Sequence, residues 1–239
     1  MPTTIYIGLE NNIEGRSLAW ALDYPGCFAY GQDEGEAIVR FAPAFIAYAD
    51  WVGRHAGGPA WLDGLRELDF RLAEVWNTYQ IDERYRVVPQ GEEINAWFRH
   101  DWQPLTAAEI ERGLLLLRWA RQDLLELVGE LSPEKMAEKK DGERWSIAGI
   151  LRHVAGAEWW YLDRLDLAGL PRAEVPDEPF ERLAVIRARL ETALPALAGR
   201  DDLVRGKAGE FWSPRKLLRR AIWHERDHWM HISRLVLEG

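Results

Sequence analysis

The sequence predicts an α+β N-terminal domain followed by an all-α four-helix bundle. Short segments with the two-residue alternation of strands occur only within residues 1–103, and long segments with helical periodicity fill residues 104–239. The charge is divided in the same way. Residues 1–103 carry 8 Arg and no Lys against 16 Asp and Glu, a net charge of −8, whereas the remainder carries 22 basic and 23 acidic residues. We therefore expect two domains, 1–103 and 104–239.

The composition excludes several classes of protein. The acidic N-terminal half lacks the basic surface that non-specific binding to nucleic acid requires. Cys27 is the only cysteine, so no internal disulfide is possible, and a reducing cytoplasm is the expected location. The chain has no basic segment followed by an apolar stretch at its start and no run of 18 apolar residues. Neither a signal peptide nor a membrane span is expected.

The N-terminal domain begins with predicted strands. Residues 3–10 alternate between apolar and polar side chains, and residues 17–31 indicate two more strands that the turn signal Pro25-Gly26 separates. Asp33 and Glu36 have the spacing of a capping box. They predict a helix through about residue 52.

The rest of this domain is predicted less regularly. Pro43 lies inside the expected helix and predicts a bend there. Residues 70–79 and 84–89 read as two strands, and the segment after them is irregular up to residue 103.

The C-terminal half shows four helical segments with helix-start signals. Thr106 with Glu109 forms a second capping box, Ser146 caps the second helix, and Ser213 precedes a proline at the first helical position of the last one. A polar loop is expected at 132–144, and a long connection at 169–179. Four amphipathic helices of this length predict a four-helix bundle. They are expected at residues 107–131, 147–168, 180–198 and 214–237.

Histidines are concentrated in two of these helices. His224 and His228 are one helical turn apart, about 40° around the helix and about 6 Å between Cβ atoms, which suits two ligands of one metal ion. His231 follows on the same stripe, and His153 lies on the apolar face of the second helix. If these two helices are antiparallel, His153 is level with residues near 228–231. Three neutral imidazoles then converge, and a metal would relieve the cost of burying them unpaired. The alternative is that they are hydrogen-bonded core residues that bind nothing.

The segment "HERDHWMH" at 224–231 also contains the H-E-x-x-H pattern of zinc proteases, with Glu225 as general base. Such enzymes take a third ligand well downstream of the pair. Only 11 residues follow His228, and His231 is too close along the same helix to serve. A protease is therefore not the expected function.

Two stretches, "WSIAGILRHVAGAEWWY" and "WSPRKLLRRAIWHERDHWMHI", resemble the second-helix and last-helix motifs of the DinB/YfiT-like metalloenzyme family. The resemblance covers about residues 104–237. It implies a bundle with an up-down-down-up course, for which the 169–179 connection supplies the long crossover. It also implies that His153, His224 and His228 are the metal ligands. Three roles stay open for His231: a hydrogen-bond partner that supports the metal ligands, a contact to the substrate, or packing alone.

Residues 3–90 resemble the HicB-like antitoxin domain, through "YIGLE" and "ALDYPGCFAYGQDEGEAI". Members of that family often pair with a small basic toxin and carry a DNA-binding segment. Here the bundle stands in place of that segment, which argues against a repressor. The resemblance and the acidic composition leave a basic protein partner, or a contact with the bundle, as expectations.

Two functions follow from these features. The first is an enzyme in which a divalent metal (Zn, Ni, Mn or Fe) activates water or a low-molecular-weight thiol cosubstrate, as a transferase or hydrolase acting on a small molecule. Glu158 or Glu225 would be a general base or a partner of the ligands, the alternative for each being a solvated or helix-pairing charge. The second is a non-catalytic metal-binding or protein-interaction module. The resemblance to the DinB/YfiT-like family also implies a homodimer.

A group of tryptophans lies close to these histidines in sequence and is expected either to wall an apolar substrate pocket or to belong to the core: Trp159, Trp160, Trp223 and Trp229. His55 and His100 are expected in surface loops.

Overall fold

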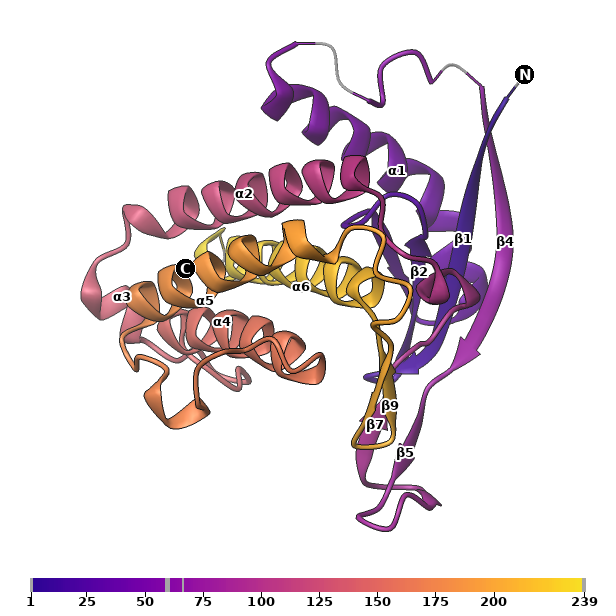
Figure 1. The fold of residues 1–239 in the computed structure, drawn as a ribbon. Helices are drawn as coiled ribbons and strands as arrows, with labels where there is room; N and C mark the ends of the chain where they lie inside the picture. Colours follow the sequence, from indigo (N-terminus) through magenta and orange to yellow (C-terminus); the bar gives the residue numbers. More distant parts are fainter. Residues whose placement is uncertain (1, 59–60, 66, 238–239) are drawn as a thin grey trace. The chain divides into compact units, whose positions relative to one another are not determined.

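The computed structural model describes residues 2–58, 61–65 and 67–237 (Figure 1). The chain divides into two compact units. The first contains residues 1–103 together with 204–216, and the second contains residues 104–203 and 217–239. The segment 204–216, which the sequence placed with the bundle, is therefore grouped with the N-terminal residues.

The first unit is built on a mixed sheet with the strand order β3-β2-β1-β4. Strands β1 (Thr3–Ile13), β2 (Arg16–Ala21) and β3 (Phe28–Gly31) form an antiparallel meander, and β4 (Leu68–Asn77) pairs in parallel with β1. The parallel pairing needs a crossover, which contains the helix α1 (Glu34–Ala56).

The helix α1 begins where the capping signal predicts. The side chain of Asp33 accepts a hydrogen bond from the backbone N–H of Glu36, and Pro43 lies inside the helix, which continues beyond it. Phe41 and Phe45 each pack edge-to-face on Phe70 of β4, with ring centroids 5.6 and 5.7 Å apart. These aromatic contacts join α1 to the sheet and form much of the core of this unit.

Short elements complete the first unit. The strands β5 (Tyr79–Ile81), β6 (Val87–Val88) and β7 (Glu92–Ile94) form a small sheet, and a 3-10 turn, η1, follows at Arg99–Trp102. The hairpin of β8 (Arg205–Lys207) and β9 (Glu210–Trp212) was not predicted. It belongs to this unit because Glu210 accepts a hydrogen bond from the backbone N–H of Asn95, at 2.8 Å, and pairs with the buried Lys216.

The second unit is helical. Its long helices are α2 (Ala107–Gly129), α4 (Ile147–Arg164), α5 (Pro179–Ala193) and α6 (Pro214–Leu237), the last of which begins in the first unit. The 132–144 loop contains a short helix, α3 (Pro133–Ala137), which was not expected because five residues are too few to show a period. The connection before α5 includes the 3-10 turn η2 (Arg172–Glu174). A further turn, η3 (Leu194–Leu197), takes over at Pro195 where the third predicted helix was to continue.

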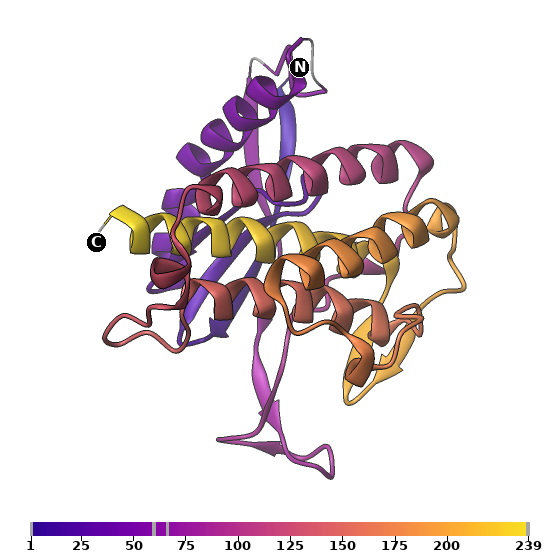
Figure 2. The same ribbon diagram turned by 90° about the vertical axis from the view of Figure 1, so that its left-hand side faces the viewer.

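Helix starts follow the predicted caps. Thr106 and Glu109 make both hydrogen bonds of the capping box, and Ser146 accepts from the backbone N–H of Gly149. Figures 1 and 2 show that α2 and α6 run in one direction and that α4 and α5 run in the opposite one. All four helices contribute to one apolar cluster, which includes Leu124, Leu151, Ile186 and Ile232. Within the described residues, no helix is long and apolar enough to cross a membrane.

Candidate metal centre

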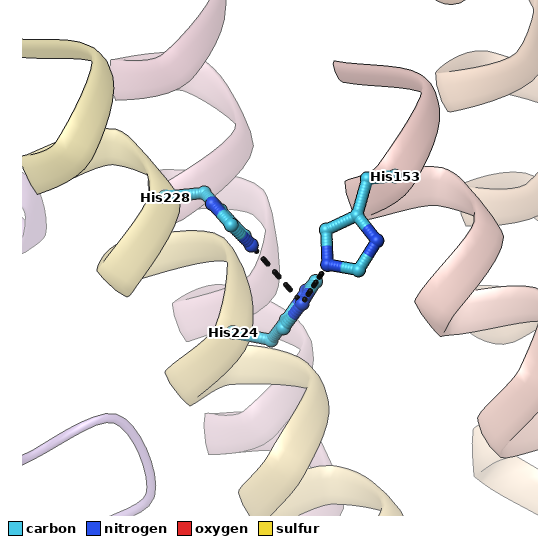
Figure 3. A group of neighbouring side chains, drawn as sticks. All are labelled: His153, His224 and His228. Atoms are coloured by element: carbon cyan, nitrogen blue, oxygen red, sulfur yellow. Dashed lines mark hydrogen bonds between the residues drawn. The ribbon is translucent and has the colours of Figure 1, made fainter. Parts of the chain in front are cut away.

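Three histidine side chains from two helices meet at one point in the second unit. His153 comes from α4, and His224 and His228 come from successive turns of α6 (Figure 3). The Nε2 atom of His224 lies 3.0 Å from that of His153 and 3.2 Å from that of His228. The three ligand atoms all lie within 4.8 Å of one another. The chain therefore presents three imidazole nitrogens to one small volume.

The separations of the His224 nitrogen from those of His153 and His228 fit ligands of a single metal ion. Nitrogen atoms at 2.0–2.1 Å from a tetrahedral ion are about 3.3 Å apart, and those on one face of an octahedron are about 3.0 Å apart. Without a cation, neutral imidazoles at this distance must share the few ring protons available, because each has one donor and one acceptor nitrogen. The geometry and the donor set thus suit a divalent metal such as Zn, Ni or Fe.

The surroundings keep the imidazoles of His224 and His228 neutral. Burial lowers the pKa of His224 well below its ordinary value, and the nearby His228, His153 and Arg220 lower it further. Burial also lowers the pKa of His228 to about 3, with His153 and His231 adding to the effect. A neutral imidazole has the free lone pair that metal ligation requires.

The segment that precedes α4 packs against the cluster. The ring of Trp145 stacks on that of His153, with centroids 4.5 Å apart and an interplanar angle of 24°. The guanidinium of Arg144 lies over the Trp145 ring, 4.4 Å from its centroid. The stack restricts rotation of the His153 ring. Sequence reasoning missed this role of Trp145, although the Trp-Ser pair before the helix start was a signal.

His231 lies apart from the three converging nitrogens. Its Nε2 atom is 2.9 Å from a carboxylate oxygen of Glu143, and its ring centroid is 6.0 Å from that of His228. His231 is therefore paired with the loop before α4. Nothing in the sequence pointed to Glu143, because the two residues are 88 positions apart.

Glu158 and Glu225 lie in the interior of the helical unit. Glu158 is 1% exposed and Glu225 is not exposed, so neither is a solvated charge, and of the two alternatives to a role in the site the helix-pairing charge is the one that agrees with their contacts. Their carboxylates accept hydrogen bonds from Arg121 of α2 and Arg187 of α5. Burial favours a higher pKa for Glu225, but the charges of Arg187 and Arg121 outweigh it and lower the pKa. A carboxylate held in this way is a poor proton acceptor.

The remaining predicted residues are divided between core and surface. Trp223 is buried, whereas Trp229 is 37% exposed. Trp159 is half-buried and donates its indole N–H to the carbonyl of Leu170, while Trp160 is half-buried beneath the guanidinium of Arg164. Trp223 therefore belongs to the core, and Trp159 packs against the apolar cluster of the helical unit.

The expectation that His55 and His100 lie in surface loops is wrong. His55 is in the last turn of α1, beside Trp51. His100 is in η1 with a side chain only 10% exposed, 3.1 Å from a carboxylate oxygen of Asp23. The partner of His55 is one helical turn away in the sequence, whereas that of His100 is 77 positions away and forms no local pattern.

Comparison with known proteins bears on the helical part of the chain. No curated protein and no solved structure matches the sequence. The family model of the DinB superfamily matches residues 116–232, a range that contains His153, His224 and His228. This match and the three-histidine cluster fit a metal-binding protein of the DinB-like type.

Proposed function

We propose that the helical unit is a metal-dependent enzyme of the DinB-like type, in which His153, His224 and His228 hold one divalent metal ion. The metal would be Zn, Ni, Mn or Fe, and the reaction a transfer or hydrolysis that uses a low-molecular-weight thiol or water. The observation that carries the proposal is the convergence of the three Nε2 atoms, 3.0 and 3.2 Å apart along the cluster. The family match over residues 116–232 supports it independently.

The fold that goes with this proposal is a four-helix bundle with an up-down-down-up course. The opposed directions of α2 and α6 against α4 and α5 support it (Figure 2). So does the single apolar cluster to which these helices contribute. The connection between α4 and α5, which includes η2, is long enough to join two parallel neighbours.

The chain's own residues prepare the site for such chemistry. A bound divalent metal supplies a Lewis acid, which lowers the pKa of a water or thiol ligand so that it is a nucleophile near neutral pH. His153, His224 and His228 would hold the metal and would leave room for that water or thiol. Trp145 orients the His153 ring, and burial keeps His224 and His228 deprotonated. With Glu158 and Glu225 held by arginines, we assign neither a proton-transfer role.

Elemental mass spectrometry of purified protein tests the metal. Wild-type protein from cells grown with Zn, Ni, Mn and Fe available is expected to carry about one equivalent of metal. The His228→Ala protein from the same cells is expected to carry much less. His231→Ala is the matched control, because it removes an imidazole from the same helix face without touching the converging nitrogens. Wild type without stoichiometric metal would contradict the proposal.

A second candidate is a non-catalytic metal-binding or protein-interaction module. The observation that favours it is the N-terminal unit, whose acidic composition and exposed apolar side chains, such as Val39 at 76% and Ile46 at 63%, suit recognition of a protein. A HicB-like fold for this unit, a basic protein partner and a homodimer belong to this proposal. Assays of thiol transfer and ester hydrolysis on metal-loaded wild type and His228→Ala distinguish the two. Activity that depends on His228 supports the enzyme, and metal binding with no activity supports the module.

A further inference from the structure

Each of the helices α2, α4, α5 and α6 contributes one buried charged side chain to a single network. Two are arginines and two are glutamates, so the network carries no net charge. All four are at most 8% exposed: Arg121, Glu158, Arg187 and Glu225.

The hydrogen bonds of the network cross between helices. Arg187 donates from Nη2 to both Glu158 and Glu225, and from Nε to Glu158 at 3.1 Å. Arg121 donates from Nε to Glu225 and from Nη2 to Glu158 at 3.5 Å. Each arginine also donates to a backbone carbonyl of the other's helix, Arg121 to Leu183 at 2.8 Å and Arg187 to Leu117 at 2.5 Å. Both guanidinium groups are thus fixed from several sides.

The two glutamates stand beside the metal-ligating histidines in the chain. Glu225 occupies the helical turn between His224 and His228. Glu158 follows His153 by five residues, about 7.5 Å along α4. Because Arg187 binds both carboxylates with one nitrogen, it ties α4 to α6 at the residue next to His224 and between one and two turns of α4 beyond His153.

Stability alone gives little reason for such a network. Removing four charges from water is costly, and well-packed apolar residues of similar volume often stabilise a core equally well or better. What a bidentate guanidinium adds is geometry, since its planar fork accepts a carboxylate only in a narrow range of orientations. Rotation of α4 or α6 about its axis would break several of these bonds together, whereas apolar contacts tolerate small rotations.

We propose that Arg121, Glu158, Arg187 and Glu225 are positioning residues that fix the rotation and register of α4 against α6, so that His153 meets His224 and His228. The inference rests on the proposed function for its consequence, which is metal affinity. It makes a separate claim about the metal-free protein, namely that the histidine cluster is already assembled by the network.

Substitution Arg187→Lys tests the first consequence. It keeps the positive charge and removes the fork that binds both glutamates. We expect metal affinity to fall about 10- to 100-fold, the range measured for residues that orient metal ligands. The absorption spectrum of Co²⁺ in the site should change as well. The matched control is Arg118→Lys, since Arg118 also joins α2 to α5, through an exposed ion pair with Glu191 at 2.9 Å. The control should bind metal as wild type does. Wild-type affinity and spectrum in folded Arg187→Lys would overturn the proposal.

A second variant replaces all four charged residues together by Leu and Met. This variant decides the question if Arg187→Lys fails to fold. A folded variant with wild-type metal affinity would overturn the proposal, and a melting temperature at or above that of wild type with at least tenfold weaker binding would support it.

Nitrogen NMR of the histidine side chains in metal-free protein separates this inference from the proposed function. In wild type, the imidazole shifts of His153, His224 and His228 should report close mutual contact, and Arg187→Lys should move them while Arg118→Lys leaves them in place. Unchanged shifts in Arg187→Lys would overturn the positioning role even if wild type bound no metal. Shifts that move, in a protein that takes up no metal, would support the network and refute only the metal-dependent function.

Discussion

The low pKa of His228 predicts how the metal-free protein responds to acid. In the folded chain, burial together with His153 and His231 holds the pKa of His228 at about 3, against 6.5 as its ordinary value. Between these two values the unfolded chain binds a proton that the folded chain excludes. The free energy of unfolding therefore falls as the pH is lowered through 6.5 and towards 3, and the contribution of this group is fully present only above 6.5.

The size of the effect follows from the two pKa values. Linkage gives about 1.4 kcal/mol for each pH unit well inside this window, and about 2 kcal/mol for His228 between pH 7 and pH 5. Burial, together with His228, His153 and Arg220, lowers the pKa of His224 in the same direction, so His224 adds to this loss. In His228→Ala that proton is absent from both states, so the fall in stability from pH 7 to pH 5 should be smaller by about 2 kcal/mol.

Urea unfolding followed by circular dichroism, with a chelator present, measures this difference at both pH values. His55→Ala serves as the control, because that histidine lies in the other unit, in the last turn of α1. The free energy of unfolding of His55→Ala should fall between pH 7 and pH 5 by as much as that of wild type. If wild type and His228→Ala lose the same free energy between pH 7 and pH 5, the buried neutral state assigned to His228 is wrong.

Three further predictions concern stability. Glu225→Ala leaves Arg121 and Arg187 buried without one of their carboxylates, and it should lower the free energy of unfolding by about 3–5 kcal/mol. Arg118→Ala, which removes an ion pair at the surface, should lower it by less than about 1 kcal/mol. Denaturant midpoints measure both changes. Thr106→Ala removes the capping box of α2 and should cost about 1 kcal/mol in the same measurement, with no effect on metal content; a loss of metal would show that the cap does more than start the helix. Gly31→Ala places a Cβ 2.2 Å from the backbone nitrogen of Ala37, so it should lower the free energy of unfolding by more than the roughly 1–3 kcal/mol typical of an overpacked side chain. Gly53→Ala, inside α1 with open space around it, should raise the melting temperature. Equal effects of the two substitutions would refute the close approach of β3 to α1.

Local signals in the sequence were enough to locate much of the helical unit. The side chains of Thr106 and Ser146 cap α2 and α4 as their spacing predicts, and the hydroxyl of Ser213 accepts from the backbone N–H of Lys216 at the start of α6. The i, i+4 spacing of His224 and His228 placed two imidazoles together because helix geometry alone determines that distance. His153 required only one further assumption, that α4 and α6 are antiparallel.

Other features depend on contacts that no local pattern encodes. The charges that neutralise Glu158 and Glu225 come from Arg121 and Arg187, which are between 29 and 104 positions away along the chain. Both arginines lie within the apolar stripe of their helix, Arg121 between Leu117 and Leu124 and Arg187 between Leu183 and Leu190, but this spacing does not identify the carboxylates that they bind. The β8–β9 hairpin was missed for a related reason, since strands of three residues are too short to show alternation.

The division of the chain has a practical consequence for anyone who wishes to study its halves. Residues 204–216 belong to the first unit, so the backbone passes between the units three times, after residues 103, 203 and 216. A fragment that stops at residue 103 would lack Glu210, which accepts from the backbone of Asn95, and Lys216, which pairs with Glu210 inside that unit. A fragment that starts at 104 would carry the same hairpin without the strands it belongs to. No single cut yields either unit whole, and obtaining one requires its two segments to be joined by a linker or co-expressed.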